Sequence, residues 1–507
     1  MFFSLCSAAA LGLDCKPIDI EVDVSPSWPG FILVGLGDTA VKEAKERIRT
    51  AWKNTGLQYP HGKGIVVNLA PADTRKEGSS FDLPIALGLY IADKNIQNVR
   101  LDDALFVGEL ALSGELRPVK GVLPLAIYAK ENGFKKIFLP EMNAKEAAII
   151  GGIEIYPVRS FGQMLKHLHG SLPIRTIPNI DPQSFFEKEE YPLDMAHIRG
   201  QTMSKRALEI AASGGHNVLL NGPPGSGKTL LSRTLPSILP KLTPQEAIEV
   251  TKIYSVAGLL TKQTPLITKR PFRSPHHSAS HVALVGGGQY PSPGEISLAH
   301  KGILFLDEFP EFPRGVLETL RGPLEDGIVT ISRAQGTLTF PASFTLIASQ
   351  NPCPCGYATD PDKSCICSPR QIQNYQKKIS GPLLDRIDLH IEVPKVAFSK
   401  LTQPGLAESS KSIRERVEEA REIQTKRFAH AGISANSEMK NTHIREYCQI
   451  DKSSEALLRQ AMHMYNLSAR SFHRILKVAR TIADLSSDLN ISSTHISEAL
   501  QFRQKTD

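Results

Sequence analysis

The 507-residue chain contains no segment of about 18 uninterrupted apolar residues, so no stretch of it reads as a membrane-spanning helix. Residues 1–15 are largely apolar, as in a secretion signal. They lack the basic residues with which such a signal opens, and Asp14 stands where a small residue would precede a cleavage site. We therefore expect a first buried strand there, not a secretion signal, and a protein of the cytoplasm without membrane contact.

The charge of the chain is nearly balanced, and no internal repeat of fixed period occurs. Lys and Arg total 59 against 52 Asp and Glu, which gives a net charge of +7. Spread over this length, the excess permits contact with nucleic acid but does not demonstrate it. A hydrophobic content of 41% excludes disordered and collagen-like classes.

The pattern of the chain divides it into two α/β domains and a helical lid. Residues 1–170 alternate β-rich runs such as 65–69 with amphipathic segments such as 40–52. Residues 171–193 carry four prolines and three glutamates, a composition that favours an extended linker. Residues 194–397 again alternate strands with helices, which predicts a mainly parallel sheet, and residues 398–507 have a helical pattern.

A complete phosphate-binding loop, GPPGSGKT at residues 222–229, stands between an apolar strand and a helix-compatible run. Lys228 can reach the β- and γ-phosphates of a nucleoside triphosphate, and the Thr229 hydroxyl can hold Mg²⁺. The glycines let backbone N–H groups close around the β-phosphate. The other predicted nucleotide-binding residues of the loop are Gly222, Pro223, Gly225, Ser226 and Gly227. The sequence therefore predicts that the chain binds and hydrolyses ATP.

Two further apolar strands end in polar residues. Ile303–Leu306 delivers Asp307, which can hold the magnesium shell, and Glu308, which can orient and deprotonate the attacking water. Residues 345–348 lead to Asn351, which can reach the γ-phosphate or the water from an adjacent strand. Glu308 and Asn351 are therefore candidate catalytic residues, and Asp307 is a candidate magnesium ligand.

The order of these elements, followed by SGPLLDRID at residues 380–388, resembles AAA+ ATPases over residues 194–507. Longer strings are similar to the magnesium-chelatase-related AAA+ ATPases of the ComM/YifB family. These strings are RSPHH at 273–277, PGEISLAH at 293–300 and NPCPCG at 351–356. The resemblance implies an AAA+ core with a β-hairpin inserted before the polar strand tip, with ATP and Mg²⁺ as cofactors.

The same resemblance implies roles for three arginines. Arg386 would be an arginine finger that enters the site of a neighbouring subunit, and Arg470 would sense nucleotide from the lid. Arg474 stands four residues later on the same helix face and is the alternative to Arg470. The inserted hairpin would turn at 333–336, and Arg333 is a candidate contact to DNA in the pore of a homo-hexamer.

Four of the seven cysteines lie within 15 positions, and their density suits tetrahedral Zn²⁺. They form two C-x-C pairs: Cys353, Cys355, Cys365 and Cys367. Paired zinc ligands are more often separated by two residues, so redox-active thiols and free thiols stay as alternatives to structural zinc. Four histidines lack comparable spacing, and we expect polar loop contacts from them: His276, His277, His281 and His300.

Residues 34–121 resemble the Lon-protease-like domain, with Ser80 at the position of its nucleophile. The lysine that a Ser–Lys dyad requires is replaced by Leu123, which cannot act as a base. Lys120 stands three residues earlier, where a strand or turn gives it a different face and reach. We therefore expect a non-proteolytic domain that supports ring formation and nucleic-acid binding.

These resemblances together imply an ATP-dependent hexameric DNA motor. It would be a helicase or branch-migration translocase that acts on branched or single-stranded DNA during recombination or natural transformation. The alternative is a chelatase-like ATPase that remodels a protein partner and has no activity on DNA.

Overall fold

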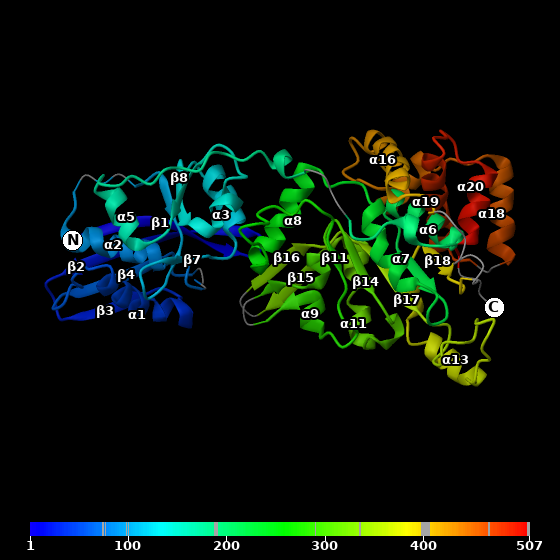
Figure 1. Ribbon diagram of the computed structural model, residues 1–507, viewed down its shortest axis with the longest axis horizontal. Helices are drawn as coiled ribbons and strands as arrows, with labels where there is room; N and C mark the ends of the chain where they lie inside the picture. The colour runs from blue at the N-terminus through cyan, green and yellow to red at the C-terminus, as the bar shows by residue number, and fades with distance from the viewer. Residues whose placement is uncertain are drawn as a thin grey trace.

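The computed structural model describes residues 1–73, 76, 78–97, 99, 101–186, 191–288, 291–333, 336–396, 406–464 and 467–503. An amino-terminal α/β domain, a phosphate-loop domain and a helical region follow one another along the longest axis of the molecule (Figure 1). Within the described ranges, no helix is long and apolar enough to cross a membrane. The predicted α/β class, with a parallel sheet and a helical C-terminal region, is confirmed.

A seven-stranded sheet in the order β3-β4-β2-β1-β5-β8-β9 carries the amino-terminal domain. Its strands are β1 (Phe2–Leu11), β2 (Asp14–Ser25), β3 (Gly30–Val34), β4 (Gly64–Ala70), β5 (Ala104–Phe106), β8 (Lys136–Pro140) and β9 (Glu154–Val158), and β6 (Glu109–Leu110) pairs with β7 (Leu116–Arg117) beside it. The helices are α1 (Thr39–Asn54), α2 (Asp82–Lys94), α3 (Val122–Glu131), α4 (Ala144–Ala147) and α5 (Phe161–Leu168). The buried side chains of α1 recur at helical spacing, as Val41, Ala44, Ile48 and Ala51.

The first strand expected within residues 1–15 is present as β1, but it is shorter than the segment, because the chain turns back in a hairpin. β1 ends at Leu11, and β2 begins at Asp14 and pairs with β1 in antiparallel register from Phe2↔Asp23 to Leu11↔Asp14. Gly12 adopts a φ of +66°, a left-handed conformation that glycine enters without steric cost. The apolar pattern continues through this turn, so periodicity alone did not reveal it.

The phosphate-loop domain is built on a fully parallel five-stranded sheet in the order β11-β14-β17-β10-β18. These strands are β10 (Val218–Asn221), β11 (Phe272–Arg273), β14 (Ile303–Leu306), β17 (Thr345–Gln350) and β18 (Leu389–Glu392). Two hairpins add β12 (Gly286–Gly287) with β13 (Ser292–Pro293), and β15 (Ile328–Arg333) with β16 (Gly336–Pro341). The helices are α6 (Thr202–Gly214), α7 (Lys228–Thr234), α8 (Pro244–Ala257), α9 (His281–Val285), α10 (Glu295–Leu298), α11 (Arg314–Glu318), α12 (Arg321–Asp326), α13 (Pro369–Gln376) and α14 (Gly381–Leu384).

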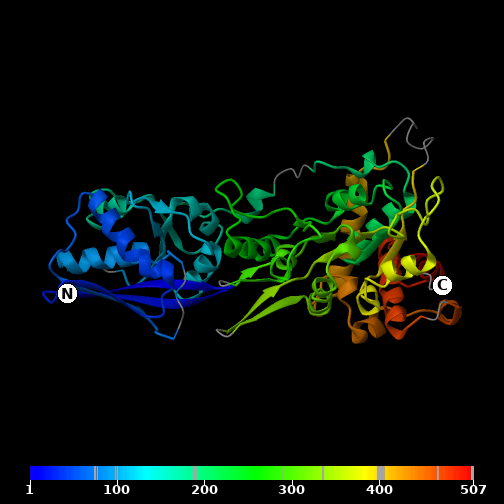
Figure 2. The same ribbon diagram turned by 90° about the horizontal axis from the view of Figure 1, so that it is seen from below.

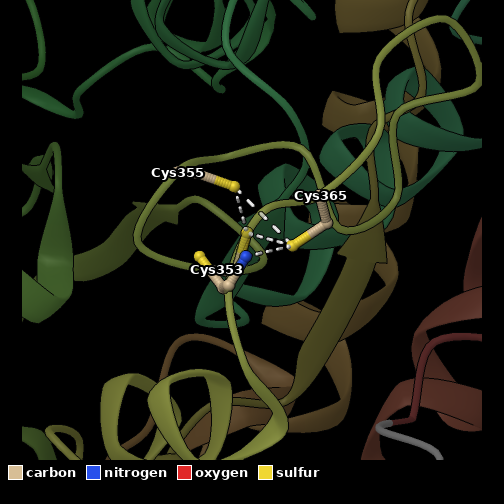
Figure 3. Close-up of side chains that lie close together, drawn as sticks. Cys353, Cys355 and Cys365 are labelled. Carbon is tan, nitrogen blue, oxygen red and sulfur yellow. Dashed lines mark hydrogen bonds between the residues drawn. The ribbon is translucent and has the colours of Figure 1, made fainter.

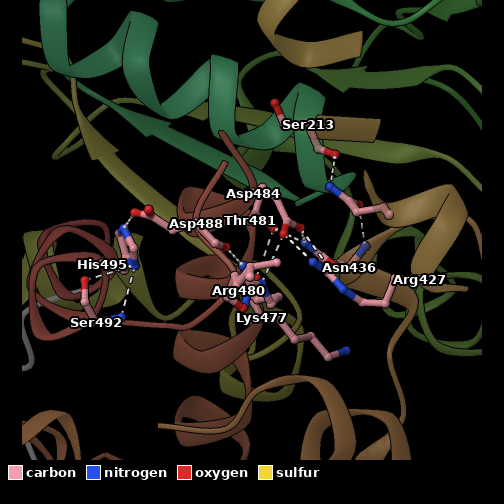
Figure 4. Close-up of polar contacts among 12 residues, drawn as sticks. Ser213, Arg427, Asn436, Lys477, Arg480, Thr481, Asp484, Asp488, Ser492 and His495 are labelled. Carbon is pink, nitrogen blue, oxygen red and sulfur yellow. Dashed lines mark hydrogen bonds and ion pairs between the residues drawn. The ribbon is translucent and has the colours of Figure 1, made fainter. Parts of the chain in front are cut away.

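The C-terminal region is helical, with α16 (Ser410–Arg427), α17 (Asn441–Tyr447), α18 (Lys452–Met464), α19 (Ala469–Leu485) and α20 (Ser493–Gln501). A buried polar network ties α16 to α19 (Figure 4). Asp484 accepts hydrogen bonds from Arg427 and Asn436, each at 2.8 Å, and from Arg480 at 3.1 Å. Because a buried carboxylate without such partners would be costly, the network fixes how these helices pack.

In the described part of the chain, the contacts of the amino-terminal domain with the phosphate-loop domain include the turn of the β1–β2 hairpin and the end of α8. The turn of the β1–β2 hairpin reaches the β15–β16 hairpin (Figure 2), where a Cβ at Gly12 would lie 3.6 Å from Leu338. In the second contact, the Ser255 hydroxyl at the end of α8 donates to the buried Glu146 carboxylate and lies 3.3 Å from the Leu123 N–H group. The hairpin expected to touch DNA is therefore mechanically connected to the amino-terminal domain.

Candidate active site

The phosphate loop joins β10, an inner strand of the parallel sheet between β17 and β18, to the first residue of α7, Lys228. Gly225 and Gly227 adopt φ angles of +77° and +91°, where other residues are strained. A Cβ at Gly222 would lie only 2.2 Å from the Val393 carbonyl oxygen, so this position also requires glycine. The loop backbone is thus shaped as phosphate binding at a helix N-terminus requires.

The Lys228 ammonium group is buried under the loop. It donates to the Gly222 carbonyl at 2.5 Å, to the Pro223 carbonyl at 3.0 Å and to Asn351 Oδ1 at 3.2 Å. Burial lowers the pKa of Lys228, and the charge of Asp307 opposes this shift. The structure therefore brings the predicted phosphate-binding lysine and the predicted asparagine together.

Oxygen donors for Mg²⁺ lie beside the lysine. Thr229 Oγ1 donates to Asp307 Oδ2 at 2.9 Å, and the Ser349 hydroxyl donates to the other oxygen of the same carboxylate. Hydroxyl and carboxylate oxygens are the ligands that Mg²⁺ prefers. The two predicted magnesium ligands therefore fit that ion, and Ser349 orients one of them.

Glu308 lies at the edge of this group of residues. Its φ of +53° is unusual for a residue with a side chain, and its N–H group donates to Asp307 Oδ1 at 3.1 Å. Its carboxylate is exposed to solvent and lies 3.3 Å from His277 Nδ1. We call Lys228, Thr229, Asp307, Glu308 and Asn351 the phosphate cluster. The ends of three neighbouring parallel strands and the loop position all five.

The loop after Asn351 returns to the phosphate loop. A Cβ at Gly356 would lie 2.7 Å from the Pro224 ring, and Gly356 has a φ of +86°. Only a residue without a side chain fits this close approach, so the cysteine-rich loop packs directly on the phosphate loop.

The four clustered cysteines converge in that loop (Figure 3). Cys353 Sγ lies 3.4 Å from Cys355 Sγ and 3.7 Å from Cys365 Sγ, and all four sulfur atoms lie within 4.8 Å of one another. A tetrahedral zinc site with bonds of about 2.3 Å has sulfur–sulfur edges of about 3.8 Å. Backbone N–H groups, first that of Tyr357, lower the pKa of Cys355 to about 6. Both the spacing and a ready thiolate suit Zn²⁺.

Two of the predicted arginines lie together, beside the carboxylate of Glu325. The side chain of Arg386 is only 6% exposed, donates to Glu325 on α12, and donates to the Pro382 carbonyl at 2.5 Å. Arg470, at the start of α19, is 61% exposed and lies 3.9 Å from the same Glu325 carboxylate. We call Arg386 and Arg470 the finger face, and Glu325 is the carboxylate that they share.

Arg474, the alternative to Arg470, pairs with a buried carboxylate of its own chain. It lies 2.9 Å from the buried Asp388 carboxylate, which also lies 3.3 Å from His216 Nδ1. Burial would raise the pKa of Asp388, but Arg474 and His216 hold that pKa well below its usual range. Arg474 therefore has a structural partner, and Arg470 is the more exposed of the two arginines.

The other candidate residues from the sequence are Leu123, Lys120, Arg333 and the histidines. Leu123 is fully buried in α3, and Lys120 lies against Gly258 at the end of α8. Arg333 is the last residue of β15 and pairs with Gly336, but its side chain lies outside the described residues. In the part of the chain that the structure describes, the cysteines form the one cluster of metal-binding type, so the histidines make no second such site.

Sequence reasoning missed Glu325 and Ser349 as partners of the site, whereas His277 makes a polar contact, with Glu308, of the kind expected of it. Ser349 could have been found, because it lies near the end of β17, two residues before Asn351, and the alternation of side chains along a strand favours the same side for both. Glu325 could not, because its contact with Arg386 spans 61 positions and no local pattern marks it.

Comparison with known proteins gives matches to three family models. Residues 194–401 match the magnesium chelatase subunit ChlI model, residues 20–143 match a second ChlI model, and residues 407–503 match the model of its C-terminal part. The phosphate cluster and Arg386 fall in the first of these regions, and Arg470 falls in the third.

Full-length relatives agree with these models. The chain is 44% identical over 503 residues to the competence protein ComM of Haemophilus influenzae, covering 98% of this chain and 96% of ComM. It is 42% identical over 498 residues to YifB of Escherichia coli, with the same two coverages. Lon protease 2 of Bacillus subtilis is 29% identical over 140 residues, 27% of this chain and 24% of that protease. The partial Lon match fits the expected Lon-like domain.

Proposed function

This chain belongs to the ComM/YifB family of magnesium-chelatase-related AAA+ ATPases, and we propose that it hydrolyses ATP to move DNA through a ring of six copies. The observation that carries the ATPase half of the proposal is the phosphate cluster, in which the phosphate-binding lysine, the candidate magnesium ligands and the candidate water-orienting residues of one chain lie in one place. The DNA half is supported by the family, whose relative from Haemophilus influenzae is named a competence protein.

Each residue of the phosphate cluster has a distinct task. Lys228 and the loop N–H groups bind the β- and γ-phosphates, and Thr229 and Asp307 would hold Mg²⁺, which neutralises charge on those phosphates. Glu308 takes a proton from the attacking water, and Asn351 orients that water or the γ-phosphate. Once Lys228 exchanges its carbonyl partners for phosphate oxygens, its charge lies against the leaving group.

Hydrolysis further requires a second copy. Arg386 and Arg470 share Glu325 at the finger face, so neither guanidinium is committed to the phosphate loop of its own chain. An arginine finger supplied by a neighbour stabilises the transition state by a factor of about 10³ to 10⁵. We propose that the finger face of one copy completes the phosphate cluster of the next.

The DNA substrate would pass the β15–β16 hairpin, with Arg333 as a backbone contact. The β1–β2 turn packs on this hairpin, so a force on the hairpin can be transmitted to the amino-terminal domain. We propose branched DNA as the substrate, with branch migration during recombination or natural transformation as the reaction, in the cytoplasm.

We also propose that the four cysteines bind one structural Zn²⁺. A distance of 3.6 Å between the sulfur atoms of Cys355 and Cys365 supports this ion. Because Gly356 lies against Pro224, the ion would hold the cysteine-rich loop on the phosphate loop. Elemental analysis of untagged protein should find about one zinc per chain; less than about 0.2 would count against the proposal.

Steady-state ATP turnover with and without DNA tests the proposed function. We expect four-way junction DNA to raise turnover several-fold and linear duplex to raise it less, whereas Arg333→Ala should weaken both effects. Turnover that does not respond to any DNA would favour the chelatase-like alternative, an ATPase that remodels a protein partner. The matches to magnesium chelatase models are the observation that keeps this alternative.

A further inference from the structure

A strongly basic cavity opens between the phosphate-loop domain and the helical region. It has a volume of about 580 Å³ and is lined by α17, by α19 and by Glu325 on α12. Its basic residues are Lys440, Arg470, His473, Arg474 and Lys477. Among the described residues that line it, Glu325 is the one carboxylate.

The carboxylate of Glu325 has three cationic neighbours, Arg386, Arg470 and, on its own helix, Arg321. It accepts a hydrogen bond from Arg386 and lies 3.9 Å from Arg470, while half of its side chain is exposed to solvent. Arg474 is neutralised separately by Asp388 at 2.9 Å. Glu325 thus serves both Arg386 and Arg470, while Lys440 and Lys477 add to the positive charge of the lining. The residues that line the cavity therefore carry more positive than negative charge.

Arg386 cannot be left without an anion. Its side chain is buried, and its Nε has no hydrogen-bond partner among the described residues. An unpaired buried guanidinium costs several kcal/mol, so whatever removes Glu325 must replace it. A terminal phosphate carries more charge than a carboxylate and offers oxygens to both arginines at once.

We propose that Glu325 is a displaceable counter-ion that occupies this cavity in the single subunit and yields to the terminal phosphate of ATP bound to a neighbouring copy. The contact makes the finger face self-inhibited: Arg386 leaves Glu325 only when a neighbour brings its phosphate. This inference rests on the proposed ATP hydrolysis by assembled copies, and it adds a residue that opposes assembly.

The test is ATP turnover per subunit as a function of protein concentration, compared between the wild type and Glu325→Gln. The amide keeps the shape but not the charge, so we expect half-maximal turnover at about fivefold lower protein concentration. Maximal turnover at saturating concentration should stay within about twofold of the wild type. Glu318→Gln is the matched control, because Glu318 also forms an arginine pair, at 3.1 Å from Arg321, and should not move the midpoint.

Three results would overturn the inference. An unchanged midpoint means that Glu325 does not compete for the finger, and a large fall in maximal turnover means that it supports the active finger. Loss of the fold in both Glu325→Gln and Glu325→Asp would mean that the carboxylate is a permanent structural partner.

DNA phosphates are the other possible occupant of the cavity, and binding of labelled junction DNA without nucleotide separates the two sources. If Glu325→Gln tightened DNA binding about fivefold without moving the turnover midpoint, the cavity would be a DNA site and the inference would be wrong. DNA stimulation of the wild type, measured in the same samples, reports on the proposed function independently. A shifted midpoint without DNA stimulation would keep the role of Glu325 and remove the DNA motor.

Discussion

The phosphate cluster and the finger face differ in how complete they are within one chain. In the phosphate cluster, Lys228, Thr229 and Asp307 already contact one another or their loop through bonds of 2.5 to 3.2 Å. At the finger face, Arg386 and Arg470 share the carboxylate of Glu325, which acts neither as the finger nor as the nucleotide sensor. From this comparison we propose that one chain can bind ATP, whereas efficient hydrolysis depends on a second chain.

The largest effect is expected when the candidate arginine finger, Arg386, is removed. Arg386→Ala should lower turnover about 10³-fold while ATP affinity stays within about threefold, because the residue acts on the transition state of a neighbour. Turnover at saturating protein concentration and binding of a fluorescent ATP analogue check this. Arg459→Ala, which removes an arginine that is paired and 72% exposed on α18, is the control. Full turnover by assembled Arg386→Ala would contradict the trans role.

The second prediction removes the candidate general base of the phosphate cluster, Glu308. Glu308→Gln should lower turnover about 10²-fold to 10³-fold and leave ATP binding intact, because the amide cannot accept the proton of water. Mixing this variant with Arg386→Ala sharpens the comparison. A Glu308→Gln copy still carries Arg386 and can supply it to a neighbouring Arg386→Ala copy, which still carries Glu308. Mixed rings should therefore recover part of the activity that neither variant has alone. No recovery at any mixing ratio would mean that the two regions act within one chain.

The difference between the two regions also decides what the sequence could predict. The phosphate loop is contiguous, and Asp307 and Asn351 follow neighbouring parallel strands, so strand ends alone place them together. The ion pair of Arg386 with Glu325 depends on how α12 packs beside α14 and α19, which no periodicity encodes. The turn at Gly12 was missed for a related reason, since apolar residues continue on both sides of it. Family resemblance supplied the role of Arg386, but not its partner.

Metal removal tests whether the phosphate cluster depends on the cysteine loop. Cys353→Ser should lose the zinc, lower the melting temperature, and weaken ATP binding about threefold to tenfold, because Gly356 would no longer be held on Pro224. Differential scanning fluorimetry and nucleotide titration measure these effects. Cys6→Ser, a half-buried cysteine outside the cluster, should change none of them. ATP affinity that is independent of zinc would separate the two sites.

The smallest expected effect distinguishes the two lid arginines. Arg470→Ala should lower turnover about tenfold without a change in stability, since its side chain is exposed. Arg474→Ala should instead destabilise the fold by about 3 kcal/mol, because it leaves Asp388 buried without its cation. Urea unfolding together with turnover separates them. The reverse pattern would assign the nucleotide-sensing role to Arg474.

The central claim is that ATP hydrolysis at the phosphate cluster moves DNA, and conversion of a labelled four-strand DNA junction tests it most directly. The wild type should convert the junction in the presence of ATP and Mg²⁺, and Glu308→Gln, which binds ATP without turning it over, should not. ATP turnover by the wild type with the junction left unchanged would contradict the claim.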